Sequence, residues 1–222
     1  MKKKSLSAKK KIHSNFNFKK ILKNKRIFEF YKVFVKSFEN INNSSKIAIS
    51  VSGGPDSMAL CFLISCYKFY TKNKIKTFFY LVDHGLRKNS GKEATFVKHQ
   101  LKLKKINLKI LKWKGKKPTS NLQSLARKKR YELIFNKCKK LNIETVLTAH
   151  HQDDIYETFF SRLLRGSGTE GLSSFAKTVK IFNFKNKKIL LGRPLLNLSK
   201  QDLIYISQNV FKFYVYDPSN EM

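Results

Sequence analysis

The sequence predicts an α/β fold in which helices cover both faces of a parallel sheet. From residue 47 onward, apolar runs typical of strands alternate with longer stretches typical of helices. This alternation favours a parallel sheet, because each crossover between parallel strands lays a helix on one face. The chain has 222 residues, of which 41% are hydrophobic, enough for the core of one domain with or without an appendage.

The expected elements follow in chain order. Strands are expected over residues 47–51, 76–83, 107–113 and 145–149, and the helices that follow them over 55–70, 92–103, 120–141 and 152–165. After Gly166 come a loop rich in small residues, a strand pair within 177–191 and a short helix over 199–209 with Ser199 as its cap. No apolar run approaches the roughly 20 residues of a membrane span, so no membrane partner is expected.

The formal net charge of +33 narrows the classes of partner. Such a charge attracts polyanions of any sequence, which favours nucleic acid and leaves an anionic membrane surface as the weaker alternative. Lys, Asn, Ile and Phe are all abundant, as in proteins from A+T-rich genomes, so compositional drift is a competing explanation. Cys61, Cys66 and Cys138 form no Cys-x-x-Cys pair, which favours packing roles in a reducing compartment.

Residues 1–45 are expected to form a basic N-terminal arm or helix, separate from a larger domain over residues 46–222. No acidic residue occurs through Arg26, and residues 19–41 fit one basic amphipathic helix. The segment lacks the apolar core of a secretory signal, and an organellar presequence is typically richer in arginine. A disordered basic arm is the plain alternative, and either form could help to hold RNA.

The stretch "IAISVSGGPDSMAL", residues 47–60, places two glycines and a proline between a strand and a helix. Ligands bind beyond the carboxyl ends of parallel strands, and the next helix begins with free N–H groups and a positive dipole. The groups suited to hold an anion here are the backbone of Gly53 and Gly54, the helix-starting Pro55 and the hydroxyls of Ser52 and Ser57. The stretch therefore predicts a phosphate cradle, although it matches neither the usual P-loop nor G-x-G-x-x-G.

The string Ser-Gly-Gly-Pro-Asp-Ser, residues 52–57, resembles the pyrophosphate-binding loop SGGxDS of N-type ATP pyrophosphatases, the PP-loop superfamily. The plain alternative is a glycine-rich turn with a capping aspartate. Four further segments are "VDHGLRKNS" (82–90), "NLQSLARKKRYE" (121–132), "TAHHQDDIYETFFSRLLRGSGTEGL" (148–172) and "RPLL" (193–196). In this order, the segments resemble the tRNA(Ile)-lysidine synthetase family over most of the chain.

The resemblance implies an adenine nucleotide alpha hydrolase-like, Rossmann-like fold, with residues 46–222 as the ATP-binding catalytic domain. It implies ligation of free L-lysine to the wobble cytidine of tRNA(Ile) with a CAU anticodon. ATP adenylates the C2 oxygen of that cytidine and pyrophosphate leaves, after which the lysine ε-amine displaces AMP and lysidine forms. A cytoplasmic location is expected, with an organelle as the alternative. The oligomeric state is left open, a homodimer included.

The expected catalytic residues are Asp56, Arg127, Asp154 and Glu157. Asp56 and Asp154 are oxygen ligands suited to Mg²⁺, which one or two carboxylates and substrate phosphates usually hold. Glu157 lies three residues after Asp154 on the same helix face, where a carboxylate could bind the lysine ammonium or act as a base. Arg127 is assigned to phosphate or to the cytosine carbonyl, an exposed charge being the plain alternative. The residues assigned to ATP are Ser52, Gly53, Gly54, Pro55, Asp56, Ser57, Asp83, His84 and His150.

Several of these residues have alternative roles. One of Asp153 and Asp154 is expected to serve only as a first-turn cap, and Asp83 could equally cap a turn. His150 and His151 beside carboxylates suggest zinc, but His-His-x-Asp-Asp lacks a recognised ligand spacing, so the two histidines are expected to line the ATP pocket. The arginines and glycines of residues 162–168 are assigned to the anticodon arm, or else to a helix end with a glycine cap.

The sequence departs from the family after "DPSN", residues 217–220, where relatives continue into a stretch that bears Tyr and Arg. The C-terminal tRNA-binding domains of many relatives are therefore expected to be absent, in a truncated form or one in which another part supplies those arginines. Two other classes stay open: a non-catalytic RNA-binding relative and another ATP-dependent tRNA base-modifying enzyme. The intact strings SGGPDS and HHQDDIYET argue against the non-catalytic relative.

Overall fold

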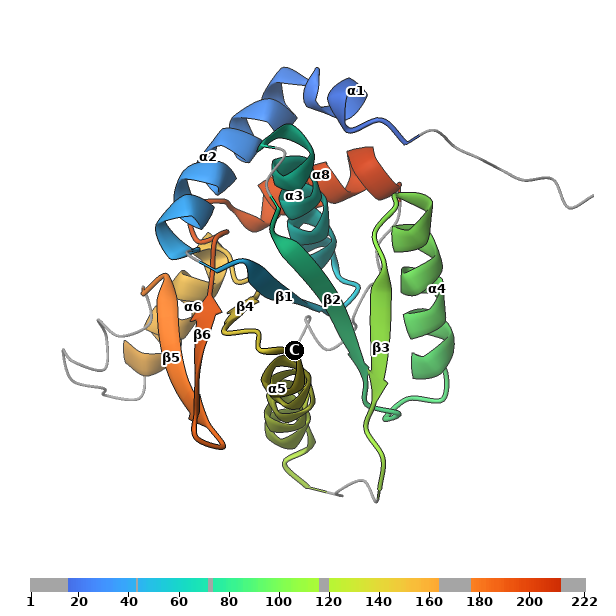
Figure 1. The fold of residues 1–222 in the computed structure, drawn as a ribbon, viewed down its shortest axis with the longest axis vertical. Coiled ribbons are helices and arrows are strands. Elements are labelled where there is room, and N and C mark those ends of the chain that lie inside the picture. The colour runs from blue at the N-terminus through green and yellow to red at the C-terminus, as the bar shows by residue number, and fades with distance from the viewer. Residues whose placement is uncertain (1–15, 43, 72–73, 116–119, 164–176, 213–222) are drawn as a thin grey trace, which may run out of the picture.

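The computed structural model describes residues 16–42, 44–71, 74–115, 120–163 and 177–212. Its centre is a six-stranded sheet with the strand order β3-β2-β1-β4-β6-β5 (Figure 1). The strands are β1 (Lys46–Val51), β2 (Lys76–Asp83), β3 (Leu108–Lys112), β4 (Thr145–Leu147), β5 (Val179–Phe184) and β6 (Lys187–Gly192). Every neighbouring pair is parallel except β5 and β6, which run antiparallel, so the predicted parallel sheet carries a hairpin strand at one edge.

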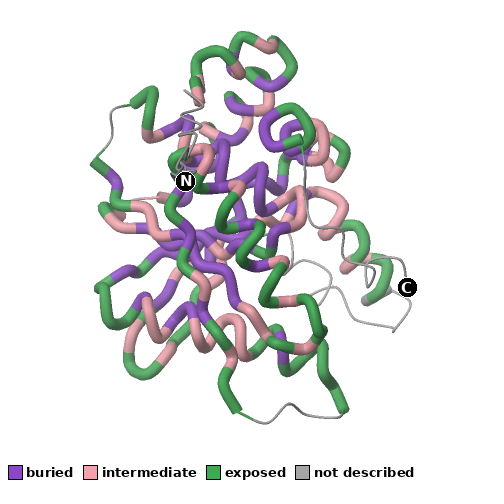
Figure 2. Tube along the Cα trace, turned by 90° about the vertical axis from the view of Figure 1, so that its right-hand side faces the viewer, coloured by how far each residue is buried: buried purple, intermediate pink, exposed green. Residues whose placement is uncertain are grey.

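Helices cover both faces of the sheet, which confirms the predicted fold class. One face packs against α1 (Phe18–Leu22), α2 (Lys25–Ile41), α3 (Pro55–Thr71), α4 (Ser90–Leu103) and α8 (Lys200–Phe211), and the other against α5 (Leu122–Leu141). Successive side chains of a strand point to opposite faces, so Ile47 and Ile49 of β1 enter the first core cluster and Ala48 enters the second. The buried residues accordingly run through the middle of the molecule in Figure 2.

The N-terminal segment forms two helices, and the prediction of one helix over residues 19–41 is wrong. The break falls at Asn24, whose side-chain oxygen accepts a hydrogen bond from the Ile27 N–H at 3.2 Å and caps α2. Phe34 and Phe38 of α2 are fully buried in the same cluster as β1. The division of the chain at residues 45 and 46 stays a prediction, and α2 packs against the core of the part that follows it.

Strand β1 is the point at which the strand order reverses. The chain places β2 and β3 on one side of β1, and β4, β6 and β5 on the other. Where the connections from two neighbouring strands run to opposite sides, a crevice opens at the carboxyl edge of the sheet. Ligands of open α/β folds bind in this crevice. The loop after β1 and the start of α6 (Gln152–Leu163), which follows β4, meet at this crevice.

The edge of the sheet is a hairpin with a two-residue turn. Lys185 and Asn186 join β5 to β6, and both have positive φ angles, 48° and 62°, as a primed hairpin turn requires. Among the residues described, no helix combines the length and apolar character that crossing a membrane would need.

Candidate active site

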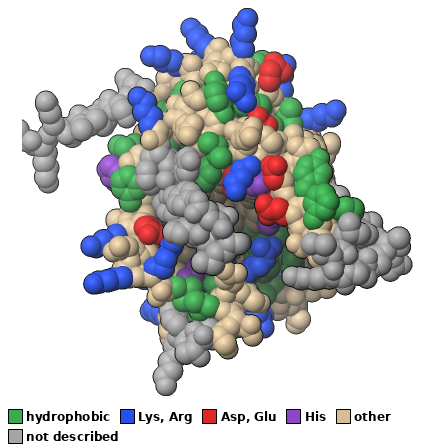
Figure 3. Space-filling model, turned by 180° about the vertical axis from the view of Figure 1, so that it is seen from behind, with side chains coloured by type: hydrophobic (Ala, Val, Ile, Leu, Met, Phe, Trp, Pro, Cys, Tyr) green, Lys and Arg blue, Asp and Glu red, His purple; other side chains and the backbone are tan. Residues whose placement is uncertain are grey.

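The candidate site lies at the carboxyl ends of β1, β4 and β6. The loop of residues 52–55 follows β1, residues 148–154 follow β4, and Arg193 follows β6 directly. Seen from behind, Figure 3 shows acidic, basic and histidine side chains gathered around a hollow near the middle of the molecule. The segments after β1, β4 and β6 are therefore brought together along one edge of the sheet.

Ser57 organises the glycine loop. Its hydroxyl oxygen accepts hydrogen bonds from the Ser52 N–H at 3.2 Å and the Gly53 N–H at 3.1 Å, and its O–H donates to the Gly54 carbonyl at 3.0 Å. Gly53 has a φ of 95°, a conformation that residues with a side chain rarely adopt, so this position requires glycine. These hydrogen bonds stabilise the shape of the loop, and the first turn of α3 begins at Pro55.

A buried histidine links the loop to α6. His151 is only 4% exposed, and its Nε2 lies 3.8 Å from an Asp56 carboxylate oxygen and 3.7 Å from an Asp154 carboxylate oxygen. Its Nδ1 lies 3.4 Å from an Asp153 carboxylate oxygen. The cluster therefore joins the aspartate of the Ser-Gly-Gly-Pro-Asp-Ser loop to both aspartates of the His-His-x-Asp-Asp segment, on the two sides of the crevice.

The carboxylate of Asp56 is unusual within the cluster. Its Oδ1 is buried and has no hydrogen-bond partner among the residues that the structure describes. Burial raises the pKa of Asp56, the neighbouring His151 opposes that rise, and the neighbouring Asp154 adds to it. A buried acceptor without a donor is suited to a cation, because an unmatched carboxylate oxygen otherwise costs free energy.

The two consecutive aspartates have different contacts. Asp154 accepts a hydrogen bond from the His151 N–H at 2.8 Å, which caps the first turn of its own helix. Asp153 accepts a hydrogen bond from the Lys200 N–H at 2.6 Å and so caps the start of α8. Glu157 lies one turn further along α6 and is exposed. The described contacts of the His151 cluster do not include Glu157.

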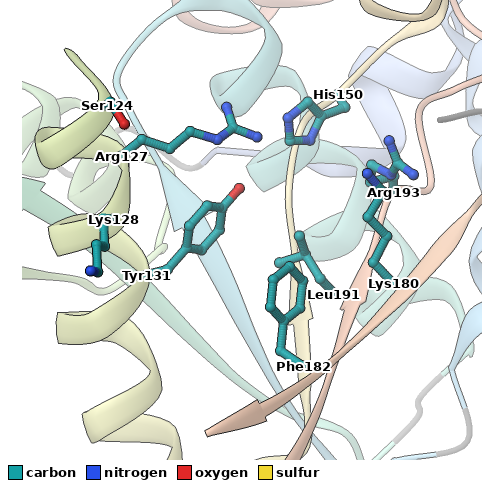
Figure 4. A pocket seen from close by; sticks show the side chains of 9 residues that line it. All are labelled: Ser124, Arg127, Lys128, Tyr131, His150, Lys180, Phe182, Leu191 and Arg193. Atoms are coloured by element: carbon teal, nitrogen blue, oxygen red, sulfur yellow. The ribbon is translucent and has the colours of Figure 1, made fainter. Parts of the chain in front are cut away.

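A cavity of about 330 Å³ adjoins this cluster on the side of α5 and the hairpin. It is lined by Ser124, Arg127, Lys128, Tyr131, His150, Lys180, Phe182, Leu191 and Arg193. Figure 4 shows Arg127 and Tyr131 reaching from α5 toward His150, with Lys180, Phe182 and Arg193 on the opposite wall. The described residues of the lining include no carboxylate, so the charge of the cavity is opposite to that of the His151 cluster.

His150 is held neutral at the inner end of this cavity. Its Nδ1 lies 2.8 Å from the Thr148 hydroxyl. Burial lowers the pKa of His150 to about 4, Asp154 opposes that effect, and the cations of Arg127 and Arg193 add to it. Burial likewise lowers the pKa of Arg193, whose guanidinium donates to the Lys177 carbonyl. An uncharged imidazole beside two guanidinium groups leaves their charge available to an anion.

Asp83 and His84 lie at the end of β2, beside β1. The Asp83 carboxylate accepts a hydrogen bond from the Gly85 N–H at 3.0 Å, so it does cap a turn, the plain alternative for this residue. His84 meets the ring of Trp113 edge to face at 5.8 Å between centroids. The assignment of these two residues to ATP stays a prediction. The arginine and glycine assignments within residues 162–168 concern side chains and a loop outside the described part of the chain.

Sequence reasoning misses several residues of this site. It groups His151 with His150 as pocket lining, whereas the structure buries His151 among three carboxylates. Arg193 enters it only within the string "RPLL", although an arginine directly after a strand is an available signal. Lys180 and Phe182 have no such signal, because their placement depends on how the hairpin crosses α5.

Comparison with known proteins identifies the sequence family of the chain. A sequence profile of the family described as "PP-loop domain" matches residues 22–222. Over 187 residues the chain is 41% identical to the tRNA(Ile)-lysidine synthase of Orientia tsutsugamushi (strain Boryong), covering 84% of this chain and 40% of that protein. Over 195 residues it is 40% identical to the protein of that name from Rickettsia bellii (strain OSU 85-389), covering 85% and 43%. The chain thus spans well under half the length of these relatives, and the resemblance drawn from its motifs is confirmed.

Two solved structures share the fold. The U34-tRNA thiolase NcsA from Methanococcus maripaludis superposes with a TM-score of 0.66 at 17% identity, covering 87% of this chain and 66% of that one. The FMN adenylyltransferase of Candida glabrata gives a TM-score of 0.51 at 13% identity, covering 85% and 60%. At these identities the likeness concerns the fold alone, and it agrees with the predicted α/β fold class.

Proposed function

Because the chain belongs to the PP-loop domain family, we propose that it uses ATP to ligate L-lysine to C2 of the wobble cytidine in tRNA(Ile) with a CAU anticodon. The products are lysidine, AMP and pyrophosphate. The observation that carries the proposal is the His151 cluster, which joins Asp56 of the glycine loop to Asp154 of α6 in one site. The names of the relatives from Orientia and Rickettsia support the choice of substrate.

In this proposal the glycine loop binds the leaving pyrophosphate. The loop shape is set by Ser57, and the first turn of α3 adds amide groups and a positive dipole at the same end. Prearranged donors of this kind stabilise the charge that develops on the α-phosphate and on pyrophosphate during adenylation. Ser52, which is exposed, would add a hydroxyl group to the cradle, whereas the buried Ser57 hydroxyl is already bonded within the loop.

Asp56 and Asp154 are the residues that would hold Mg²⁺. Their carboxylates approach the same His151 nitrogen, and the buried Oδ1 of Asp56 has no donor among the described residues, so the two residues fit a hard cation. A bound Mg²⁺ supplies positive charge that offsets the phosphate oxygens during transfer. The same carboxylates, with Glu157 one turn further along α6, form the acidic surface on which the lysine ammonium would be bound and then deprotonated.

The cationic cavity is the side from which the cytidine would enter. In this proposal Arg127 and Arg193 would contact the C2 oxygen or the α-phosphate, since both line the cavity together with His150 (Figure 4). In the first step the C2 oxygen attacks the α-phosphorus and pyrophosphate leaves. In the second step the deprotonated ε-amine of lysine attacks C2, and AMP leaves with the C2 oxygen.

The test is an incubation of the chain with ATP, Mg²⁺, radiolabelled L-lysine and unmodified tRNA(Ile) bearing a CAU anticodon. We expect label in the RNA together with one AMP for each lysine incorporated. A matched RNA in which uridine replaces the wobble cytidine is the control and should yield neither product. RNA binding without AMP would contradict the proposal and favour a non-catalytic RNA-binding relative.

A further inference from the structure

The cavity between α5 and the β5–β6 hairpin has an aromatic wall that the proposed chemistry does not use. Side chains alternate along β5, so Lys180, Phe182 and Phe184 share the face that packs toward α5. The rings of Tyr131 and Phe182 are stacked, with centroids 6.2 Å apart and planes 22° from parallel. The buried ring of Phe135 contacts both, with its centroid 5.6 Å from that of Tyr131 and 5.8 Å from that of Phe182.

The hairpin is anchored at its tip and leaves the cavity open at its base. The Lys185 ammonium donates to the Asn136 side chain at 3.0 Å, and the Lys139 ammonium donates to the Lys185 carbonyl at 3.0 Å. The Lys187 ammonium donates to the Asn142 side chain at 3.1 Å. All three contacts involve the second half of α5 or its C-terminal cap. The tip of the hairpin is therefore tied to the second half of α5, and the cavity lies beside the first half of that helix.

The charge of this opening is positive. Four of the nine lining residues carry a full positive charge, namely Arg127, Lys128, Lys180 and Arg193. On the neighbouring turn of α5, Glu132 is paired with Lys129 at 2.9 Å, so its charge is already matched outside the cavity. The Arg127 guanidinium lies 5.6 Å from the centre of the Tyr131 ring, within range of a cation–π contact.

We propose that this opening seats an unpaired nucleotide of the RNA substrate, with its base stacked on the Tyr131–Phe182 pair and its phosphate bound by Lys128 and Lys180. A positive groove with aromatic rings is the combination that holds single-stranded nucleic acid, because every base has a π face and every nucleotide a phosphate. The volume of about 330 Å³ lies within the range of small-ligand sites. The inference rests on the proposed function in that it takes RNA as the substrate.

Protection of the sheet edge is the competing explanation for a lysine on β5. Edge strands often carry inward-pointing charges that prevent pairing with other chains. Edge protection would account for Lys180 on the edge strand. It would not account for the two arginines, one from α5 and one from the end of β6, that line the same cavity. It also gives no role to Phe182, which is 37% exposed although it is stacked on Tyr131.

The first test measures stacking directly. A series of stem-loop RNAs has the sequence of the anticodon arm, and each carries 2-aminopurine at a different loop position. The fluorescence of each RNA is followed as the protein is added. We expect quenching at one position or two adjacent positions, loss of that quenching in Phe182→Leu, and a dissociation constant raised roughly 5- to 100-fold. Phe182→Trp restores both signals. Leucine keeps the apolar packing, so the variant should fold, as thermal unfolding would verify.

Residues of the β5–β6 hairpin that point away from the cavity or lie outside it provide matched controls, and a double lysine variant tests the phosphate contacts. Ile181→Ala changes the next residue of β5, which is 59% exposed on the opposite face, and should leave quenching unchanged. Lys180→Ala combined with Lys128→Ala should lower the slope of log affinity against log salt by roughly 0.7 for each phosphate that the protein no longer neutralises. Lys188→Ala, exposed on β6, should lower it less.

The outcomes separate this inference from the proposed function. Quenching that depends on Phe182, without AMP formation, supports the nucleotide seat and contradicts the ligase. Lysine incorporation with equal quenching and affinity in the unaltered chain and in Phe182→Leu supports the ligase and overturns the nucleotide seat. Absence of RNA binding by the unaltered chain overturns both.

Discussion

The two halves of the site differ in how their polar groups are held. In the half around the glycine loop, Ser57 stabilises the backbone and His151 lies within 4 Å of three carboxylates, at the N-terminal ends of α3 and α6. In the half between α5 and the hairpin, the walls are long cationic side chains and stacked rings around an open space. Bond-forming chemistry needs fixed geometry, whereas a polyanion can be bound by charges that adjust to it.

The largest effect should come from the carboxylate at the centre of the fixed half. Asp56→Asn keeps the size of the side chain and removes a charge that would hold Mg²⁺, so we expect AMP formation to fall by at least about 10³-fold, since several kcal/mol of charge stabilisation is lost. RNA affinity should stay within about twofold. Glu29→Gln, exposed on α2, is the control. Near-normal AMP formation by Asp56→Asn would remove Asp56 from the mechanism.

A residue that serves both halves should give the next largest effect. Arg127→Ala removes a guanidinium that faces both His150 and the cavity, and we expect turnover at saturating RNA to fall about 10²-fold, while RNA affinity falls less than about tenfold. Single-turnover kinetics separate the two quantities. Lys140→Ala, in the exposed last turn of α5, is the matched control for loss of a positive charge. A loss of affinity alone would make Arg127 one more phosphate contact of the open half.

The rigidity of the fixed half is tested by Ser57. Ser57→Ala leaves the N–H groups of Ser52 and Gly53 without their acceptor, so the free energy of unfolding should fall by about 1–3 kcal/mol and the KM for ATP should rise. Ser65→Ala in the same helix is the control, because the Ser65 hydroxyl donates to the Cys61 carbonyl four residues earlier and supports no loop. Urea unfolding of both variants gives the comparison. Equal stability would show that the loop keeps its shape without the hydroxyl.

The smallest effect should be the pH dependence of stability that His150 contributes, at the boundary between the two halves. The pKa of His150 is lowered to about 4, below the 6.5 of an ordinary histidine, so the folded state binds fewer protons than the unfolded state between these values. This group should therefore make stability rise as pH increases from 4 to 6.5 and add nothing further above it. An NMR titration of His150 should show a midpoint of about 4, and Arg127→Ala should move it upward. A midpoint near 6.5 in the unaltered protein would contradict the burial of this ring.

The contribution of Asp56 to stability should change with pH in the direction opposite to that of His150. Burial raises its pKa above 3.8, so its contribution to stability is fully present below pH 3.8 and is lost as pH rises through the raised value. In Asp56→Asn that loss disappears, which should make the variant more stable than the unaltered protein near neutral pH. Urea unfolding across pH 4 to 8 measures the difference.

The sequence is sufficient for the features that depend on local patterns. β2 begins at Lys76 and ends at Asp83, as predicted. The glycine loop lies between β1 and α3, as predicted, because Gly53, Gly54 and Pro55 interrupt the apolar pattern between the two elements. Parallel strands bring their carboxyl ends to one edge, which is why the segments after β1 and β4 can be assigned to one site from the sequence. The roles of individual site residues beyond that placement stay predictions.

The sequence is insufficient where partners are distant. Local pattern makes Asp153 a candidate cap for its own helix, but its carboxylate accepts from Lys200, 47 residues later, which no local pattern indicates. The stack of Tyr131 on Phe182 depends on the angle at which the hairpin crosses α5. The break at Asn24 has a visible signal, since asparagine is a preferred N-cap, but the amphipathic pattern continues through it and favours one helix.

The last helix of the described part has a consequence for synthesis of the protein. α8 is joined to α6 through the Lys200 N–H and the Asp153 carboxylate, and to the glycine loop through the Ser207 hydroxyl, which donates to the Pro55 carbonyl at 2.6 Å. A nascent chain that has left the ribosome only as far as α6 therefore contains every residue of the His151 cluster but lacks the helix that supports it. We expect such a chain to leave ATP untouched until α8 has emerged and docked, so nucleotide use begins only when the crevice is complete.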